Sequence, residues 1–96
     1  MPREQSTEFV AECLWPGVRE ADLEALGERA AICAARAEST RAPVRYLGSL
    51  LMPEDEVVLC LFRGQREAVR QVAHEAQIPF ERILKASRSR WEAGEI

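Results

Sequence analysis

The stretch from Glu56 to Phe62 constrains the fold more than any other part of the chain. It reads Glu-Val-Val-Leu-Cys-Leu-Phe, so six apolar residues in a row follow the glutamate. Alternate side chains of a β-strand point to opposite faces, and a strand with one face in water alternates apolar with polar residues. Here both faces are apolar and both need cover. The stretch therefore predicts a central strand, with helices on one face and a long loop or, more simply, a second copy of the protein on the other.

The length and charge of the chain limit the classes of function. Its 96 residues suit one small domain, with 47% apolar and 30% charged residues. The net charge is −3, from 13 Lys+Arg and 16 Asp+Glu, which gives no basic field for nucleic acid. No apolar run approaches the length that spans a membrane, and the N-terminal residues lack the apolar core of a signal peptide. We therefore expect a cytoplasmic protein with no nucleic-acid and no membrane partner.

The cysteines are also consistent with a cytoplasmic location. Cys13, Cys33 and Cys60 are odd in number, lie in apolar stretches and form no Cys-x-x-Cys pair. This pattern does not suit a disulfide framework or a zinc cluster. It predicts three buried free thiols in a reducing environment.

Apolar periodicity predicts four strands and two helices. We expect strands over residues 7–15, 44–52, 57–62 and 81–89, and helices over residues 19–39 and 65–77. Each helix carries an apolar stripe at i+3 and i+4 spacing: Leu23, Leu26, Ala30, Cys33 and Ala37 in the first, and Val69, Val72, Ala73 and Ala76 in the second. The single domain then covers residues 7–89, between a flexible leader (1–6) and a polar tail (90–96).

The order of these elements is β-α-β-β-α-β, which is the split βαβ or ferredoxin-like plan. The fold class expected is α+β, with a four-stranded antiparallel sheet and two helices on one face. In the usual strand order 4-1-3-2, strands one and three are central, which suits the two-sided apolar stretch. The other sheet face stays bare in a single copy. Domains of this kind often pair through that face into a dimeric α+β barrel, so we expect a homodimer, and the barrel interior is a common place for small ligands.

Glu12 is the first candidate site residue. It lies between Val10 and Leu14 in a strand expected to be central. A carboxylate there is costly unless it is paired, hydrogen-bonded, metal-bound or in a wet cavity. One interpretation is a general base or a ligand anchor with a raised pKa. The alternative is a carboxylate at an irregular strand end that reaches water or an arginine.

The other candidates are weaker. Tyr46 and Ser49 on the second strand, and Cys60 on the third, are expected to line a ligand cavity or simply to pack. His74 is the only histidine and lies opposite the apolar stripe of its helix, which is typical of a solvated surface residue. No Ser-His-Asp triad, phosphate-binding glycine loop or metal-ligand spacing accompanies these residues.

Four pieces of the chain resemble a known family. These are Phe9-Val10-Ala11-Glu12 followed by Pro16-Gly17, Ser49 in the second strand, Val57 to Leu61 with Cys60, and Glu67-Ala68-Val69-Arg70 through Ala76, Ile78 and Pro79. In order and spacing they resemble the small ferredoxin-like nickel-binding proteins, a family otherwise described as a domain of unknown function. The resemblance covers roughly residues 9–89, and it implies the ferredoxin-like fold and a dimer.

The chain departs from that family at two histidine positions. Gly48 stands just before Ser49 where the family usually has histidine, and Val72 stands two positions after the Val-Arg pair where it usually has another. His74 is not the equivalent of either. The resemblance therefore implies fold and dimer without nickel binding.

We expect a small-molecule-binding protein with a cavity between sheet and helices and without metal or cofactor, which takes a small apolar or aromatic ligand. One alternative is a cofactor-independent enzyme, such as a small oxygenase, cyclase or isomerase, with Glu12 as acid or base and Tyr46 or Ser49 as donor. Nickel binding as in the resembled family is a further alternative. Another is a structural or regulatory dimerisation module that uses the bare sheet face.

The two missing imidazoles give a first testable prediction. Protein dialysed after purification is expected to hold no stoichiometric nickel or zinc, because Gly48 and Val72 supply no ligand atoms. Elemental analysis measures this directly. A value near one metal per chain would contradict the prediction and make Glu12, Cys60 and His74 the first ligands to replace.

Overall fold

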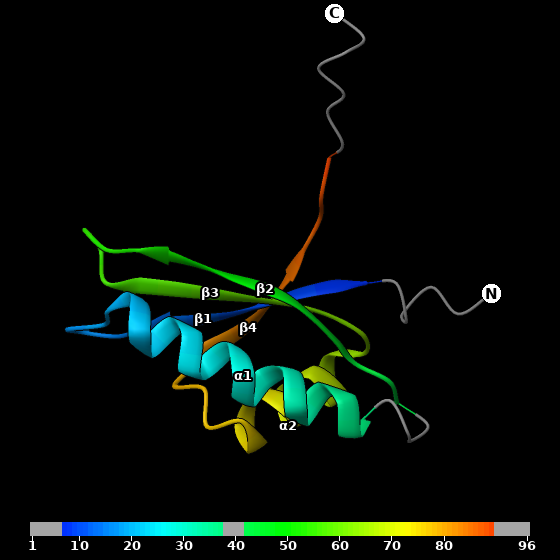
Figure 1. Ribbon diagram of the computed structural model, residues 1–96. Coiled ribbons are helices and arrows are strands. Elements are labelled where there is room, and N and C mark those ends of the chain that lie inside the picture. Colours follow the sequence, from blue (N-terminus) through cyan, green and yellow to red (C-terminus); the bar gives the residue numbers. More distant parts are fainter. Residues whose placement is uncertain (1–6, 38–41, 90–96) are drawn as a thin grey trace, which may run out of the picture.

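Four strands and two helices alternate along the chain in the predicted order. The computed structural model describes residues 7–37 and 42–89. Its elements are β1 (Glu8–Leu14), α1 (Glu20–Ala37), β2 (Arg45–Met52), β3 (Val57–Arg63), α2 (Arg66–Glu75) and β4 (Arg82–Ala86) (Figure 1). This confirms the ferredoxin-like α+β fold, with β4 ending earlier than expected. The predicted leader (1–6) and tail (90–96) lie outside the described residues.

The sheet has the strand order β2-β3-β1-β4, and every neighbouring pair is antiparallel. β3, which contains the six apolar residues from Val57 to Phe62, is therefore a central strand, as predicted. Val58, Cys60 and Phe62 of β3 are fully buried, whereas Val57, Leu59 and Leu61, on the opposite face, stay half-buried. One face of β3 is therefore fully buried, and the other is only partly covered.

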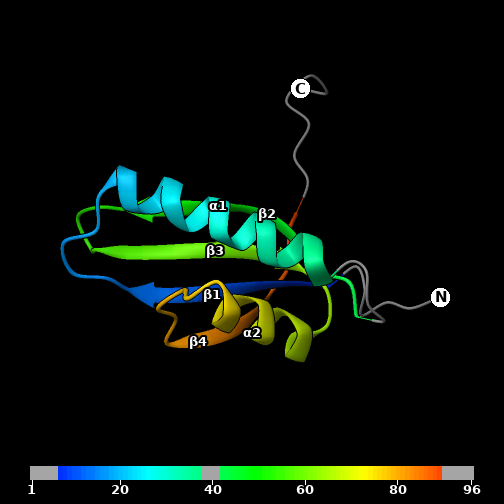
Figure 2. The same ribbon diagram turned by 60° about the horizontal axis from the view of Figure 1, so that its bottom comes forward.

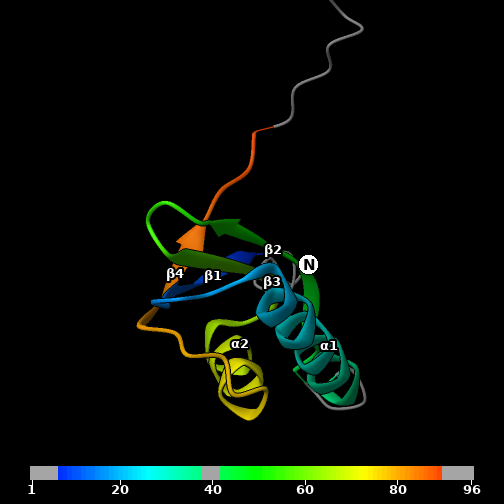
Figure 3. The same ribbon diagram turned by 60° about the vertical axis from the view of Figure 1, so that its left-hand side comes forward.

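Both helices lie on one side of the sheet (Figures 2 and 3). The predicted stripes of α1 and α2 face the strands, because apolar residues at i+3 and i+4 spacing share one side of a helix. The core between the layers includes Phe9, Ala11, Cys13, Leu26, Ala30, Cys33, Val58, Cys60, Phe62, Val69, Val72, Ala73 and Ile83. Among the described residues, no buried side-chain nitrogen or oxygen lacks a hydrogen-bond partner. The layer between helices and sheet is therefore apolar, and the buried polar side-chain atoms of the described residues all have hydrogen-bond partners.

The face of the sheet away from the helices, here named the open face, is covered by no described helix or loop (Figure 3). Strand alternation and the register place eight large apolar side chains on it, besides Ala86. Leu14, Leu50 and Met52 remain 56%, 57% and 37% exposed. These eight large residues of the open face are Val10, Leu14, Leu50, Met52, Val57, Leu59, Leu61 and Leu84.

The β2–β3 hairpin is tied to the connection after β1. Glu56, which precedes β3, has a φ of 56°. Its backbone carbonyl accepts a hydrogen bond from the Trp15 N–H at 2.8 Å. Its carboxylate accepts another from the Gly17 N–H at 2.9 Å. These two bonds offset the unfavourable backbone conformation of a non-glycine residue and fix the end of the sheet at which the hairpin lies.

Gly64, directly after β3, is required by a close backbone approach. It has a φ of +154°, and an added Cβ would lie 2.9 Å from the Pro43 carbonyl oxygen. Gly64→Ala is expected to lower the free energy of unfolding by about 1–3 kcal/mol, since backbone strain and a steric contact add. Urea unfolding at neutral pH measures the change.

Gly17→Ala is the matched control for this prediction. Gly17 has a φ of +78°, but an added Cβ there meets nothing within 4 Å. That variant should lose only the conformational part, about 1 kcal/mol. Equal losses in the two variants would show that the approach to Pro43 contributes nothing.

Candidate functional site

The four residues predicted to bind a ligand lie on opposite faces of the sheet. Glu12 pairs in register with Leu59 and points to the open face. Ser49 pairs with Cys60, and both side chains point toward the helices, as does Tyr46. The structure therefore brings Tyr46, Ser49 and Cys60 together and leaves Glu12 on the other side of the sheet.

Glu12 is paired with an arginine. The Arg82 guanidinium on β4 donates from Nε to the Glu12 Oε1 at 2.6 Å. The Glu12 side chain is 25% exposed and that of Arg82 is 64% exposed. The hydrogen bond from Arg82 to Glu12 raises the pKa of Arg82, which holds the cation in its charged form. An arginine partner was one of the possibilities that the sequence left open, and the structure supplies it in the regular part of β1.

A second group of charges, not singled out from the sequence, lies at one end of the open face. Arg63 donates to Glu8 at 3.1 Å, and Arg88 donates to the other oxygen of the same carboxylate at 3.1 Å. The hydrogen bond from Arg63 is the main cause that holds the pKa of Glu8 below its ordinary value. The alternation of Glu8 with Val10 and Glu12 was a signal that this carboxylate shares their face.

Tyr46, Ser49, Cys60 and Cys13 form a polar chain on the helix side of the sheet. The Tyr46 and Ser49 hydroxyls are 2.6 Å apart, and the Tyr46 ring packs on Phe62 with centroids 5.4 Å apart. Contact with Cys60 and then burial raise the pKa of the Cys13 thiol. Burial also raises the pKa of Tyr46. The interaction with Cys13 in turn lowers the pKa of the Cys60 thiol. The raised pKa values keep the Cys13 thiol and the Tyr46 hydroxyl protonated at neutral pH.

All three cysteines are free and buried, as predicted from their apolar surroundings. His74 is exposed on α2, which confirms its expected surface position. Among residues 7–37 and 42–89, no three or more His, Cys, Asp or Glu side chains are grouped as a metal site requires. The same residues include no helix long and apolar enough to cross a membrane.

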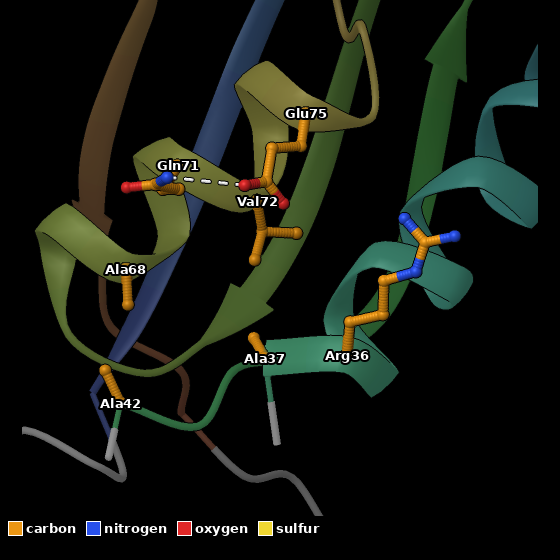
Figure 4. Close-up of a pocket in the computed structure, with 7 residues that line it drawn as sticks. All are labelled: Arg36, Ala37, Ala42, Ala68, Gln71, Val72 and Glu75. Carbon is orange, nitrogen blue, oxygen red and sulfur yellow. Dashed lines mark hydrogen bonds between the residues drawn. The ribbon is translucent and has the colours of Figure 1, made fainter. Parts of the chain in front are cut away.

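A hollow of about 510 Å³ lies between the end of α1 and α2, on the helix layer (Figure 4). Arg36, Gln71 and Glu75 give it polar groups, and the Gln71 amide donates to the Glu75 carboxylate at 3.3 Å. Its other walls are apolar side chains of Ala37, Ala42, Ala68 and Val72. None of the four predicted ligand-binding residues lines it. The small side chains that face each other here were the sequence signal for such a space.

Comparisons with known proteins support the fold. No protein-family model matches the chain, and no curated protein matches it. Among solved structures, the crystal structure of SCO4226 from Streptomyces coelicolor A3(2) is similar, with a TM-score of 0.70 and 17% sequence identity. The similarity covers 86% of this chain and 99% of that one. At this identity it shows a shared fold.

The lowered pKa of Glu8 predicts a pH-dependent contribution to stability. A carboxylate whose pKa falls on folding stabilises the protein above its ordinary pKa near 4.5, and this contribution is lost as the pH falls through the lower folded value. Glu8→Gln should therefore be less stable than the wild type at pH 7, and the difference should vanish near pH 2. Urea unfolding at both pH values tests this. A difference of the same size at both would show that Glu8 acts through packing and not through its charge.

Proposed function

We propose that this protein is a homodimeric interaction module, whose open face packs against the open face of a second copy. The observation that carries the proposal is the set of eight apolar side chains on that face, three of them more than a third exposed. Monomeric proteins rarely expose large contiguous apolar patches, and such patches commonly mark interaction sites. A second copy on the open face would also explain why β3 is apolar on both of its faces.

The charges of the open face also suit a protein partner. Glu12 is neutralised by Arg82, and Glu8 by Arg63 and Arg88, so each carboxylate enters a contact already paired. A lone carboxylate amid apolar residues would oppose burial strongly, whereas a hydrogen-bonded pair opposes it less. An ion pair inside an apolar interface also favours one alignment of the two surfaces over others.

Small-molecule binding is a second candidate, and the hollow between α1 and α2 favours it. Its volume of about 510 Å³ and its mostly apolar walls with a few polar groups are typical of ligand sites. A small apolar or aromatic ligand suits those walls. In a dimer, the space between the two sheets is a further place for such a ligand, and Glu12 faces it.

The enzyme alternative has less support. Glu12 as acid or base and Tyr46 or Ser49 as donor would have to meet at one substrate, yet they face opposite sides of the sheet within one copy. The resemblance to the nickel-binding family and a cytoplasmic location both stay predictions. For these reasons we place the interaction module first.

The dimer proposal is tested by light scattering at micromolar concentration. The wild type is expected to have twice the mass of one chain. Leu50→Glu should shift it to monomer, because the new carboxylate would be buried among the apolar side chains of the contact. Ile32→Glu is the matched control, since Ile32 on α1 is 54% exposed and Leu50 is 57% exposed. A monomeric wild type, or equal effects of the two variants, would overturn the proposal.

Native mass spectrometry of the purified protein separates the candidates. A dimer without added mass supports the interaction module alone. A small-molecule adduct of fixed mass on each chain would place ligand binding first.

A further inference from the structure

The two ends of the open face carry opposite charge. At one end, here named the basic end, Arg45 and Arg63 are paired in register on β2 and β3, and Arg88 follows β4. Glu8 is the one carboxylate in this row, where it binds both Arg63 and Arg88. Arg45 is exposed and forms no ion pair with another described residue. Within the described part of the chain, three arginines against one glutamate make this end positive.

The other end of the sheet is the β2–β3 hairpin, Pro53-Glu54-Asp55-Glu56, here named the acidic hairpin (Figure 1). Glu54 and Asp55 are exposed and form no ion pair with another described residue. The third carboxylate of the hairpin, Glu56, accepts a hydrogen bond from the Gly17 N–H. The nearby connection from β1 to α1 carries one arginine, Arg19, so this end stays negative.

The two ends are far enough apart to act separately. A strand rises about 3.3 Å per residue, so the seven residues of β3 separate the ends by roughly 20 Å. Screening in about 0.1 M salt reduces electrostatic interactions beyond about 10 Å. Each end therefore acts mainly on charges of a partner that lie directly over it.

Two open faces can be stacked with a twofold axis in two simple ways. An axis along the strands sets basic end over basic end and acidic hairpin over acidic hairpin. An axis across the strands sets the acidic hairpin of each copy over the basic end of the other, and the favourable contact occurs twice. Both arrangements bury the same apolar residues, so charge decides between them.

We infer that the second copy lies head to tail on the open face, with the twofold axis across the strands and each acidic hairpin against the partner's basic end. This inference rests on the proposed dimer and adds its orientation. Opposite charges at the rim of an interface speed association and fix its alignment, and like charges brought together disfavour the competing alignment. The exposed Arg45, Glu54 and Asp55 thereby gain charged partners that residues 7–37 and 42–89 of the same copy do not supply.

Cross-linking tests the orientation directly. Arg45 and Asp55 lie at opposite ends of the same sheet, too far apart to be joined within one chain by a short linker. In the head-to-tail dimer, Arg45 of each copy lies near Asp55 of the other. The double variant Arg45→Cys/Asp55→Cys, treated with a short bis-maleimide, should therefore give covalent dimers, because stacked sheets lie about 10 Å apart.

Each single variant is the control. Arg45→Cys alone places its two thiols at opposite ends of the dimer, and so does Asp55→Cys alone, so each should give about a tenth or less of the covalent dimer. The wild-type cysteines are buried and should not react. Efficient cross-linking of either single variant would overturn the inference in favour of the other axis. A double variant that is dimeric by light scattering but does not cross-link would overturn it as well.

Charge exchange gives an independent test. Arg45→Glu and Asp55→Lys should each weaken the dimer by about tenfold in dissociation constant at low salt, since each sets like charges together. Their combination should recover affinity to within about threefold, because the exchanged charges attract again. Glu28→Lys, on the exposed side of α1, is the control and should change nothing.

The outcomes separate the two proposals. A wild type that is monomeric would overturn both, including the case in which another segment of this chain covers the open face. A dimer whose dissociation constant is not recovered in the combined variant would overturn the orientation alone.

Discussion

The structure depends on one strand that is apolar on both faces. β3 has Val58, Cys60 and Phe62 on one side, and packing of α1 and α2 against them forms the core. Val57, Leu59 and Leu61 on the other side cannot be reached by those helices, because both lie in one layer (Figure 2). Satisfying the first face therefore leaves the second face in need of a partner, and the assembly proposed for this protein follows from that constraint.

Much of the fold could be predicted from the sequence, because the helices and strands follow from local apolar periodicity. The apolar stripes of the two helices and the two-sided apolar strand predicted the order of the elements. That order in turn predicted the topology of the sheet. The position of Tyr46 beside Ser49 could not be predicted, because strict alternation sets residues three apart on opposite faces. An irregularity between Tyr46 and Gly48 shifts the register and brings both hydroxyls to the helix side. A pattern of period two carries no sign of such a bulge.

The candidate site was harder to predict because its contacts join distant parts of the chain. Arg82 reaches Glu12 across 70 positions of sequence, and only the pairing of β1 with β4 brings them together. The sequence showed that Glu12 needed a partner but not which one. Because Arg82 pairs with Glu12, the partial burial of this carboxylate is not by itself a sign of a catalytic or ligand-binding site. The same holds for the thiols: Cys13 and Cys60 are far apart in the sequence, and the pairing of β1 with β3 brings them close together in the core.

On the open face, apolar area favours association and charge selects the alignment of the two copies. The eight apolar side chains favour burial without direction, since the hydrophobic effect is roughly proportional to area and indifferent to orientation. The charges at the two ends are exposed and contribute less to affinity than the apolar area, but they distinguish one alignment from another. A homodimer built this way would have a stability that rises with protein concentration, because the apolar face is covered only in the paired form. Association and folding would then be linked through the strand that the chain cannot cover alone.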